Sequence, residues 1–566
     1  MKTSLLSCVV CSVAVSVALG APVTLYVEPG TPTHGESGTQ LDPFHSIQDA
    51  INAAATNDPG SSNHVIRVGG GTYAHGLQEN FSTNFANGDR WSGLGEAVNS
   101  KSLINIYSTN GYLNGLQLVG AGVGKSIIDA KYADGVGRVM YVSNNTVRVQ
   151  GFTLTGGQCG PRAGGAAMLI HGSYCTFQDL LITTNRTTGA NTYHIVCTAA
   201  GPGTAMAPPH NLTFRNIEIM GNYGDNAADS SRVALALVKT YSNLIANVSI
   251  HANIGMHGIM FDNPDDTYVG TVVFGCLVAG NSLYGTGNPW SGCGIIGGRS
   301  YNYFVNNTVA VNGNNGYFNG GLALGNILVN NIFYQDIGGI TNAPAGSGAR
   351  AYYLANNVIN EAGFHWDNNS EATDGYPYPG NTGSNNTNAQ PQFFNAPVSV
   401  DTTTANAPDA STVKVTSTAR YSVGEYIEAN RDRVARQVTA KPDGTTLTVT
   451  PGFPSNLGLG CLVRQWGSNN TNLVANYACR PAGDGLDRGG LMRTNAVSGF
   501  LYVDVDNSGG YMAGRDIIVG PGNYTPSPSD WVVATDIAGG PRLKLSGIDA
   551  GAYEYRPSIG TVIVLR

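Results

Sequence analysis

NVSIHAN (247–253) is the stretch that decides the fold, because its order of apolar and polar residues returns along the chain. In each copy an apolar–x–apolar triplet is followed, after one or two residues, by Asn. The other copies are LLITTN (180–185), NIEIMGN (216–222), CLVAGN (276–281) and TVAVNGN (308–314), with weaker ones at NIFYQD (331–336) and NVINEA (357–362). Taking Asn185, Asn222, Asn253, Asn281 and Asn314 as markers, the steps are 37, 31, 28 and 33 residues by subtraction. The chain therefore repeats with a period of about thirty residues.

Each repeat carries short alternating segments, such as YCTFQDLLI (174–182) and YFVNNTVAV (303–311), which suit strands with one buried side. A unit this small cannot bury its own apolar side chains, whereas stacked units share one continuous interior. The recurring Asn suits a turn with left-handed geometry, or hydrogen bonding to its counterpart in the next coil. A propeller would need four strands in about 40–45 residues and an aromatic signature that we do not find. The sequence therefore predicts an all-β parallel β-helix.

The composition fits this prediction and excludes several partners. Only 12% of the 566 residues are charged, which is too few for the wet faces of long helices, while 76 are Gly. The net charge is -7, and the absence of a basic run argues against nucleic acid. An acidic polymer would need local cations or bound metal. The loop GAGVGKS (120–126) has Val119 where a nucleotide-binding loop requires Gly, so no nucleotide is expected.

The N-terminus has the pattern of an export signal. Lys2 precedes an apolar run from Leu5 to Leu19, and small residues follow at Gly20 and Ala21. The run is too short for a membrane span, so we expect residues 1–20 to be removed and the protein to be secreted to the extracellular space or cell surface. Seven scattered cysteines remain, and Cys461 with Cys479 is the only pair worth testing for a disulfide.

Both ends of the chain resemble secreted bacterial right-handed parallel β-helix proteins of the pectate-lyase-like superfamily. The segments that carry the resemblance are LYVEPG (25–30), LDPFHSIQDAINAA (41–54), IRVGGGTY (66–73), LQLVGAGVGKSIIDA (116–130), RPAGDGLDRGG (480–490) and DIAGGPRLKLSGIDAGAYEY (536–555). The resemblance implies an N-terminal helix that caps the coil, and Phe44, Ile47, Ala50, Ile51 and Ala54 do recur at helical spacing. It implies no single reaction, because that superfamily includes lyases, hydrolases, epimerases and proteins without known catalysis.

These patterns divide the chain into five parts. A cap and first coils at 21–125 follow the signal peptide, and the β-helix core covers 126–397. Residues 398–466 lose the Asn phrase and alternate in a different way, which predicts a small β module with a hairpin turn at PDG (442–444) and leaves open a carbohydrate-binding role. Residues 467–566 are expected to close the helix.

Stacked coils place distant residues in rows along the axis. Counting back from the repeated Asn puts Phe177, Ile245, Val273 and Phe304 in one interior layer. Counting six residues further back from three of these puts His171, Lys239 and Gly298 in register, and Arg299 is the residue after Gly298. The strand of the intervening coil ends at Asp262, and Asp265 and Asp266 follow in its loop.

A row of Lys, Asp and Arg suits the cleavage of a uronic-acid polysaccharide by β-elimination. In this hypothesis Lys239 is the base and Arg299 stabilises the developing anion. Asp262, Asp265 and Asp266 would bind Ca²⁺, which neutralises the substrate carboxylate. Many lyases of the resembled superfamily use Ca²⁺ with Lys or Arg, although their full motif is not matched residue by residue. His257 is a further catalytic candidate, and His171 is a candidate for substrate binding or proton transfer.

Other interpretations stay open. The charged row is equally compatible with turn and surface residues on a non-catalytic binding solenoid. A glycoside hydrolase would use the paired carboxylates Asp225 and Asp229, which lie near Arg232. Tyr284 and Trp290 are candidates for stacking on sugar rings in either case.

Overall fold

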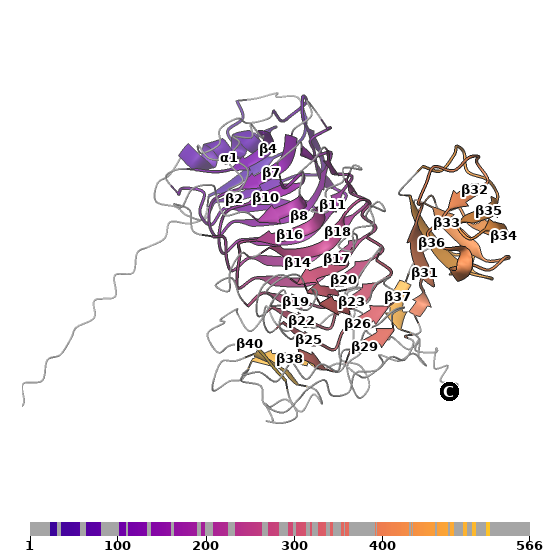
Figure 1. Ribbon diagram of the computed structural model, residues 1–566. Helices are drawn as coiled ribbons and strands as arrows, with labels where there is room; N and C mark the ends of the chain where they lie inside the picture. Colours follow the sequence, from indigo (N-terminus) through magenta and orange to yellow (C-terminus); the bar gives the residue numbers. More distant parts are fainter. Residues whose placement is uncertain are drawn as a thin grey trace, which may run out of the picture.

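The computed structural model is a solenoid in which the strands of each coil pair in parallel with those of its neighbours (Figure 1). The structure describes most of residues 23–360 and 391–479, with gaps in the connecting loops, and three further strands between residues 491 and 520. Within these residues the coils form a 17-stranded and a 12-stranded sheet. Crossovers between parallel strands are almost always right-handed. The fold is the right-handed parallel β-helix that the sequence predicted.

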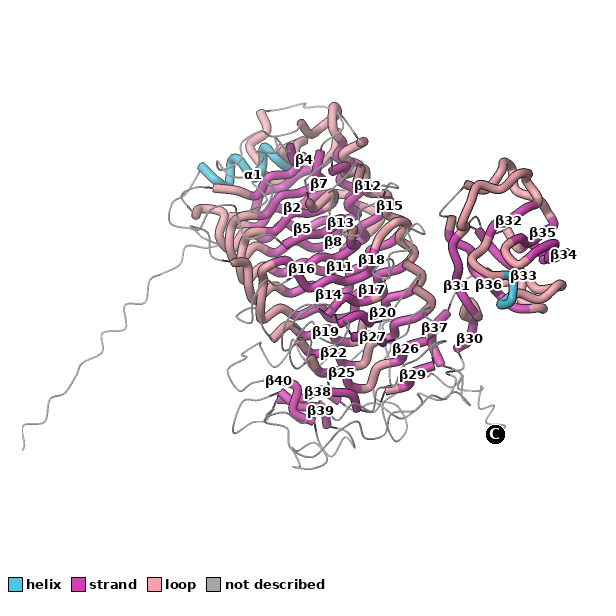
Figure 2. Tube along the Cα trace, in the orientation of Figure 1, coloured by secondary structure: helices cyan, strands magenta, loops and turns pink. Residues whose placement is uncertain are grey.

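Figure 2 shows the two sheets winding around one interior. The 12-stranded sheet contains β4 (Lys101–Ile106), β7 (Gly137–Val142), β9 (Gln158–Cys159), β10 (Met168–Ile170), β12 (Arg186–Thr187), β13 (His194–Thr198), β15 (Tyr223–Gly224), β16 (Val233–Val238), β18 (His257–Asp262), β21 (Ile295–Gly297), β24 (Tyr317–Asn319) and β27 (Ile340–Asn342).

The 17-stranded sheet has more strands, and the cap helix contacts β1 and β2 of this sheet and β4 of the other. It contains β1 (Thr24–Val27), β2 (Val65–Val68), β3 (Gly71–Ala74), β5 (Gln117–Gly120), β6 (Ser126–Asp129), β8 (Arg148–Thr155), β11 (Thr176–Thr183), β14 (Thr213–Met220), β17 (Leu244–His251), β19 (Val272–Phe274), β20 (Leu277–Ala279), β22 (Tyr303–Val305), β23 (Thr308–Ala310), β25 (Ile327–Val329), β26 (Ile332–Tyr334), β28 (Tyr353–Ala355) and β29 (Val358–Asn360).

The interior is built from layers of apolar side chains in exact coil register. The layer predicted from the sequence is confirmed, and it continues through Phe177, Phe214, Ile245, Val273, Phe304 and Leu328, all of which are buried. Burial of such a side chain stabilises the fold by about 1.5–3 kcal/mol. Because each coil contributes one member, the layers hold the coils in a single register.

Each long strand bends at one residue with left-handed backbone geometry. In β11, β14 and β17 this residue is Asp179, Asn216 or Asn247, with φ of 52°, 51° and 52°. Asn and Asp adopt this conformation more easily than other residues that have a Cβ. In later coils a residue at the same place, such as Asn306 with φ of 55°, separates two short strands. The bend turns the sheet around the interior.

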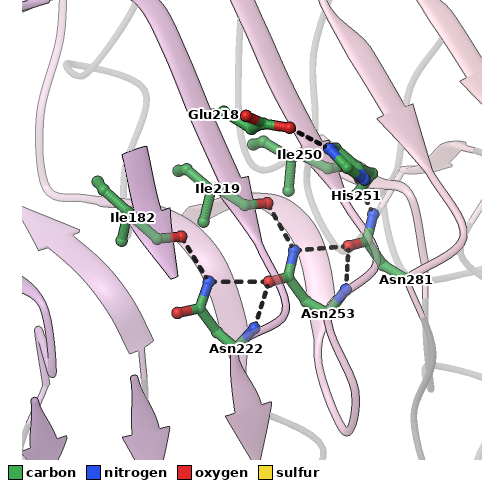
Figure 3. Close-up of polar contacts among 8 residues, drawn as sticks. All are labelled: Ile182, Glu218, Ile219, Asn222, Ile250, His251, Asn253 and Asn281. Atoms are coloured by element: carbon green, nitrogen blue, oxygen red, sulfur yellow. Dashed lines mark hydrogen bonds and ion pairs between the residues drawn. The ribbon is translucent and has the colours of Figure 1, made fainter. Parts of the chain in front are cut away.

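The predicted hydrogen bonding between repeated Asn residues is confirmed (Figure 3). Asn253 accepts from Asn222 Nδ2 at 2.9 Å and donates through its own Nδ2 to Asn281 Oδ1 at 2.9 Å. Its Nδ2 also donates to the carbonyl of Ile219 at 3.0 Å. The left-handed residue of this turn is the one before the Asn, for example Ala252 with φ of 70°. The Asn itself therefore serves as a buried hydrogen-bonding rung.

One marker of the repeat was wrong. Asn281 donates through Nδ2 to Asn312 at 3.1 Å, so Asn312 is the next rung and Asn314 is not. Asn314 lies outside the described residues. The fourth step is therefore 31 residues by subtraction, and it places Phe304 eight residues before its rung, as in the other coils.

A short helix covers the first coils, as predicted. Helix α1 (Ile47–Thr56) buries Ile47, Ala50, Ile51 and Ala54. Its first turn is held by the buried carboxylate of Glu79, which accepts from the Ser46 hydroxyl at 3.0 Å and the Ile47 amide at 2.5 Å. The N-terminus of a helix favours negative charge, but burial raises the pKa of Glu79 to about 7.

The region 398–466 forms a separate antiparallel sheet with a core of its own. Its strands are β31 (Ser399–Thr402), β32 (Thr412–Lys414), β33 (Tyr426–Ala429), β34 (Arg436–Asp443), β35 (Thr446–Thr450) and β36 (Leu462–Gly467). The hairpin between β34 and β35 turns at Gly444, within one residue of the predicted position. The buried carboxylate of Glu428 binds Arg464 at 2.5 Å and accepts from the Trp466 indole at 3.2 Å.

The remaining described strands are β30 (Phe393–Asn395), β37 (Asn476–Cys479), β38 (Leu491–Thr494), β39 (Leu501–Asp504) and β40 (Ile517–Gly520). Phe393 of β30 packs edge-on against Tyr334 of β26, with ring centroids 5.1 Å apart. β30 thus attaches the chain beyond the coils to the outer side of the helix.

The cysteines in the coils are small buried residues rather than bridges. Free thiols are found at Cys159, Cys175, Cys197, Cys276 and Cys293, all buried, and at Cys461. No helix in the described part of the chain is long and apolar enough to cross a membrane. The proposed signal peptide, residues 1–20, lies outside that part.

Candidate functional site

The outer side of the 12-stranded sheet is apolar and buried along its middle. Tyr141, Leu169, Cys197, Ala236 and Met260 follow one another in register on successive strands. They belong to a cluster distinct from the interior. Burial raises the pKa of the Cys197 thiol far above its usual range, so the thiol is protonated and unreactive at neutral pH. The middle of this outer side thus offers no reactive polar group, and the next residues to consider are those at the C-terminal ends of its strands.

Lys239 and Asp262 meet at that end. Val238, the last residue of β16, pairs with Asp262, the last residue of β18, and the Lys239 amide donates to the Asp262 carbonyl at 3.0 Å. By the alternation of β16, the Lys239 side chain would point into the apolar interior. Its left-handed backbone, with φ of 46°, ends that alternation and turns the chain. Lys239 is half-buried and Asp262 is exposed. Coil stacking thus brings together two charged residues of the predicted row.

His171 lies at the same end, one position away from its predicted register. Ile170 pairs with Thr198, and Thr198 with Leu237, so His171 is level with Val238 instead of Lys239. Strand β16 runs one residue past the level at which β10 ends, and that extra residue shifts the register. His171 is buried, and its Nδ1 lies 3.3 Å from the Tyr141 hydroxyl.

His257 begins β18 and has no exposed surface. Its Nδ1 accepts a hydrogen bond from the Cys293 amide at 3.0 Å. A nitrogen that accepts a backbone N–H carries no proton of its own. In this structure the ring of His257 therefore ties one coil to the next, away from any solvent-exposed substrate.

An aromatic column that the sequence analysis missed runs along the axis in the turns that follow β10, precede β14 and follow β16. The rings of His210 and Tyr241 are stacked with centroids 4.8 Å apart, and Tyr174 meets His210 edge-on at 4.9 Å. Tyr174 is 53% exposed. Tyr241 lies two residues after Lys239, so the aromatic column and the charged pair share one corner of the coil. The turns HGSYC (171–175) and KTYSN (239–243) each contain a Tyr, but at different positions, so aligning them does not pair the two rings.

Several predicted site residues lie outside the described residues. They are Arg299, Asp265, Asp266, Tyr284, Trp290, Asp225 and Asp229. Arg299 is two positions beyond Gly297, the end of β21, which pairs with β18. Arg232, which follows Asp225 and Asp229 in the sequence, is buried.

Of the three aspartates proposed as Ca²⁺ ligands, Asp262 is the one among the described residues. Its exposed carboxylate is an oxygen donor of the kind Ca²⁺ prefers. Among the residues that the structure describes, no three His, Cys, Asp or Glu side chains are grouped as metal ligands. A complete Ca²⁺ site would therefore require the two aspartates of the following loop.

A second polar pair lies on the outer side of the 17-stranded sheet (Figure 3). His251 Nε2 is 2.8 Å from Glu218 Oε1, and the two residues come from consecutive strands, β17 and β14. The hydrogen bond from His251 lowers the pKa of Glu218 below its usual value. Sequence patterns did not single out this pair, because its two residues occupy different positions in their repeats.

Comparison with known proteins gives likeness in structure only. No family model and no curated protein sequence matches the chain. A pectate lyase structure is 16% identical, with 60% of this chain and 78% of that chain covered and a TM-score of 0.41. A rhamnogalacturonan lyase is 14% identical, with coverage of 61% and 84% and a TM-score of 0.42. A mannuronan C-5 epimerase A-module from Azotobacter vinelandii is 13% identical, with coverage of 61% and 95% and a TM-score of 0.33. What this chain has in common with them is the right-handed parallel β-helix fold.

Proposed function

We propose that this chain is an extracellular protein that holds an acidic polysaccharide at the corner defined by Lys239, Asp262 and the aromatic column, and cleaves it by β-elimination. The observation that carries the proposal is the backbone hydrogen bond between Lys239 and Asp262, from consecutive coils, with Tyr241, whose ring stacks on His210, two residues after Lys239. Aromatic side chains provide apolar surface for sugar rings, and the charged pair provides groups for the chemistry.

The reaction needs a base at the carbon next to the uronate carboxylate. Lys239 in its neutral form would take the proton from C5, and the electron pair of that C–H bond would form the C4–C5 double bond. The C4–O4 bond would break with its electron pair on O4, which takes a proton from solvent water. A neighbouring cation favours the neutral amine and so makes a lysine a better base. Arg299, two residues beyond β21, is the candidate that would stabilise the negative charge developing on the carboxylate.

Asp262, with Asp265 and Asp266, would hold Ca²⁺. The ion would supply neutralisation of the substrate carboxylate, which makes the adjacent C–H bond more acidic. Asp262 lies beside Lys239, so a carboxylate bound through the ion would be presented close to the base.

The decisive experiment incubates the mature protein with polygalacturonate, alginate or chondroitin, each with Ca²⁺ and with a chelator. We expect ultraviolet absorbance from the new conjugated double bond, and we expect the chelator and Lys239→Ala to slow its formation at least about a hundredfold. Lys131→Ala is the matched control, because Lys131 is an exposed lysine that is also left-handed, with φ of 55°. Formation at the wild-type rate in Lys239→Ala would reject Lys239 as the base.

Two other outcomes would favour the alternatives. New reducing ends without absorbance would indicate a glycoside hydrolase that uses Asp225 and Asp229. Binding without any product would indicate a non-catalytic solenoid. Secretion is tested separately by sequencing the N-terminus of the exported protein, where we expect cleavage close to residue 20.

A further inference from the structure

The outer side of the first strands of the 17-stranded sheet carries a set of polar residues that the proposed site does not use. Two columns of side chains point outward on β1, β2, β5, β8, β11 and β14, because the column between them, with Leu118 and Phe177, faces the interior. The outward residues are Thr24, Val65, Gln117, Arg148, Thr176 and Thr213 in one column and Tyr26, Arg67, Val119, Gln150, Gln178 and Arg215 in the other. We call these twelve residues the arginine face.

The charge on this face is positive and unusual for the chain. It includes three arginines and no carboxylate, although the protein as a whole has a net charge of -7. Arg67 is exposed and Arg148 and Arg215 are half-buried. Within the described part of the chain, none of the three guanidinium groups has a hydrogen bond or ion pair, and the Nε atoms of Arg148 and Arg215 lack an acceptor. Their charge is therefore available to a ligand.

The arginines are regularly spaced. They lie on β2, β8 and β14, and one strand separates each from the next, since β5 lies between the first two and β11 between the last two. Adjacent strands are ~4.8 Å apart, so successive arginines are separated by about 10 Å along the axis. The intervening residues are mainly Gln and Thr, whose side chains can donate to and accept from hydroxyl groups.

Two carboxylates, Asp179 and Glu28, flank the face, and neither forms an ion pair with its three arginines. Asp179, at the bend of β11, already accepts from Gln178 at 3.0 Å and from Asn216 at 3.1 Å. The carboxylate of Glu28 lies over Gly69, at the end of β2. Beyond β14 the same columns become Leu244 and Ala246, which are buried, so the face ends there.

We infer that the arginine face binds a linear polyuronate, with its carboxylates at Arg67, Arg148 and Arg215 and its hydroxyl groups at the Gln and Thr side chains. An extended two-fold uronate chain presents the carboxylate of every second sugar on one side, which matches cations on every second strand. Duplex DNA fits poorly, because it carries one charge per ~1.7 Å and would bring about eleven phosphates across the ~19 Å from β2 to β14. The inference rests on the acidic class of polymer proposed above, but it does not require catalysis at Lys239.

Affinity electrophoresis of the full chain in polygalacturonate gels at low salt tests the inference. We expect Arg67→Gln/Arg148→Gln/Arg215→Gln to weaken binding about tenfold, since three solvent-accessible ion pairs at ~0.5 kcal/mol each give that factor. The matched control removes three exposed cations elsewhere, at Lys131, Arg186 and Arg420, and should leave the affinity unchanged.

The outcomes separate this inference from the proposed function. Strong retardation of wild-type protein and about tenfold weaker binding of the triple variant, with cleavage of short oligouronides intact in both, support the arginine face. Equal retardation of the two proteins overturns it, as does equal retardation by neutral dextran or tighter binding of duplex DNA. Loss of cleavage in Lys239→Ala with unchanged retardation leaves the face as a separate binding surface.

Discussion

The Asn ladder makes a quantitative prediction at Asn253. The side chain of Asn253 accepts from the Asn222 amide at 3.1 Å and from Asn222 Nδ2 at 2.9 Å, and it donates to Ile219 and Asn281. Asn253→Ala removes these bonds and leaves two buried donors of Asn222 without that acceptor. Each buried donor left unsatisfied costs about 1–3 kcal/mol. We therefore expect the free energy of unfolding to fall by about 2–6 kcal/mol.

Equilibrium unfolding in urea measures this change, provided that the slope with denaturant is the same in the variant and the wild type. Asn52→Ala is the control, because Asn52 lies on the exposed side of α1 and its replacement should change stability by less than ~0.5 kcal/mol. Hydrogen exchange at the Asn222 amide should become faster in Asn253→Ala alone. If Asn253→Ala were as stable as Asn52→Ala, the ladder would not stabilise the coil and the reasoning would be refuted.

Three further predictions concern individual side chains. Because burial raises the pKa of Glu79 from 4.5 to about 7, its stabilising contribution is complete below pH 4.5 and is lost as the pH rises through 7. Between pH 4.5 and 7 the free energy of unfolding of the wild type should therefore fall by about 3 kcal/mol relative to that of Glu79→Gln. Urea unfolding at a series of pH values measures this difference, and parallel pH profiles of the two proteins would contradict it. His251→Ala should raise the pKa of the Glu218 carboxyl toward its ordinary value in a carbon-13 NMR titration, whereas an unchanged titration would show that the hydrogen bond does not cause the lowering. Tyr174→Ala should weaken binding of an oligouronide by about 1 kcal/mol in calorimetry, roughly fivefold, while Tyr132→Ala should not, and equal losses would argue against the aromatic column.

The fold was predictable because the same physical requirement recurs in every coil. The turn after each bent strand needs a buried side chain that both donates and accepts hydrogen bonds, and Asn does both. The spacing of these Asn residues therefore reveals the register of the coils. The sequence could not choose between Asn312 and Asn314, which both follow the strand. The choice depends on Val311, whose left-handed backbone, with φ of 48°, directs Asn312 inward.

The candidate site was predictable only in part. Lys239 and Asp262 follow strands whose pairing can be derived from the repeat, and the structure places them together. His171 was one position out of register because β16 runs one residue further than β10 before its turn, and the sequence does not mark where each strand ends. The column of Tyr174, His210 and Tyr241 was missed because its members occupy different positions in their turns.

Whether coil stacking makes Lys239 and Asp262 act as one unit is tested most directly by a double-mutant cycle. Initial rates of unsaturated product formation from polygalacturonate with Ca²⁺ would be compared for wild type, Lys239→Ala, Asp262→Ala and the double variant. Groups that work together give strongly non-additive losses, so we predict that the double variant is no slower than Lys239→Ala alone. Losses that multiply, or a wild type that forms no unsaturated product from polygalacturonate, alginate or chondroitin, would contradict the account.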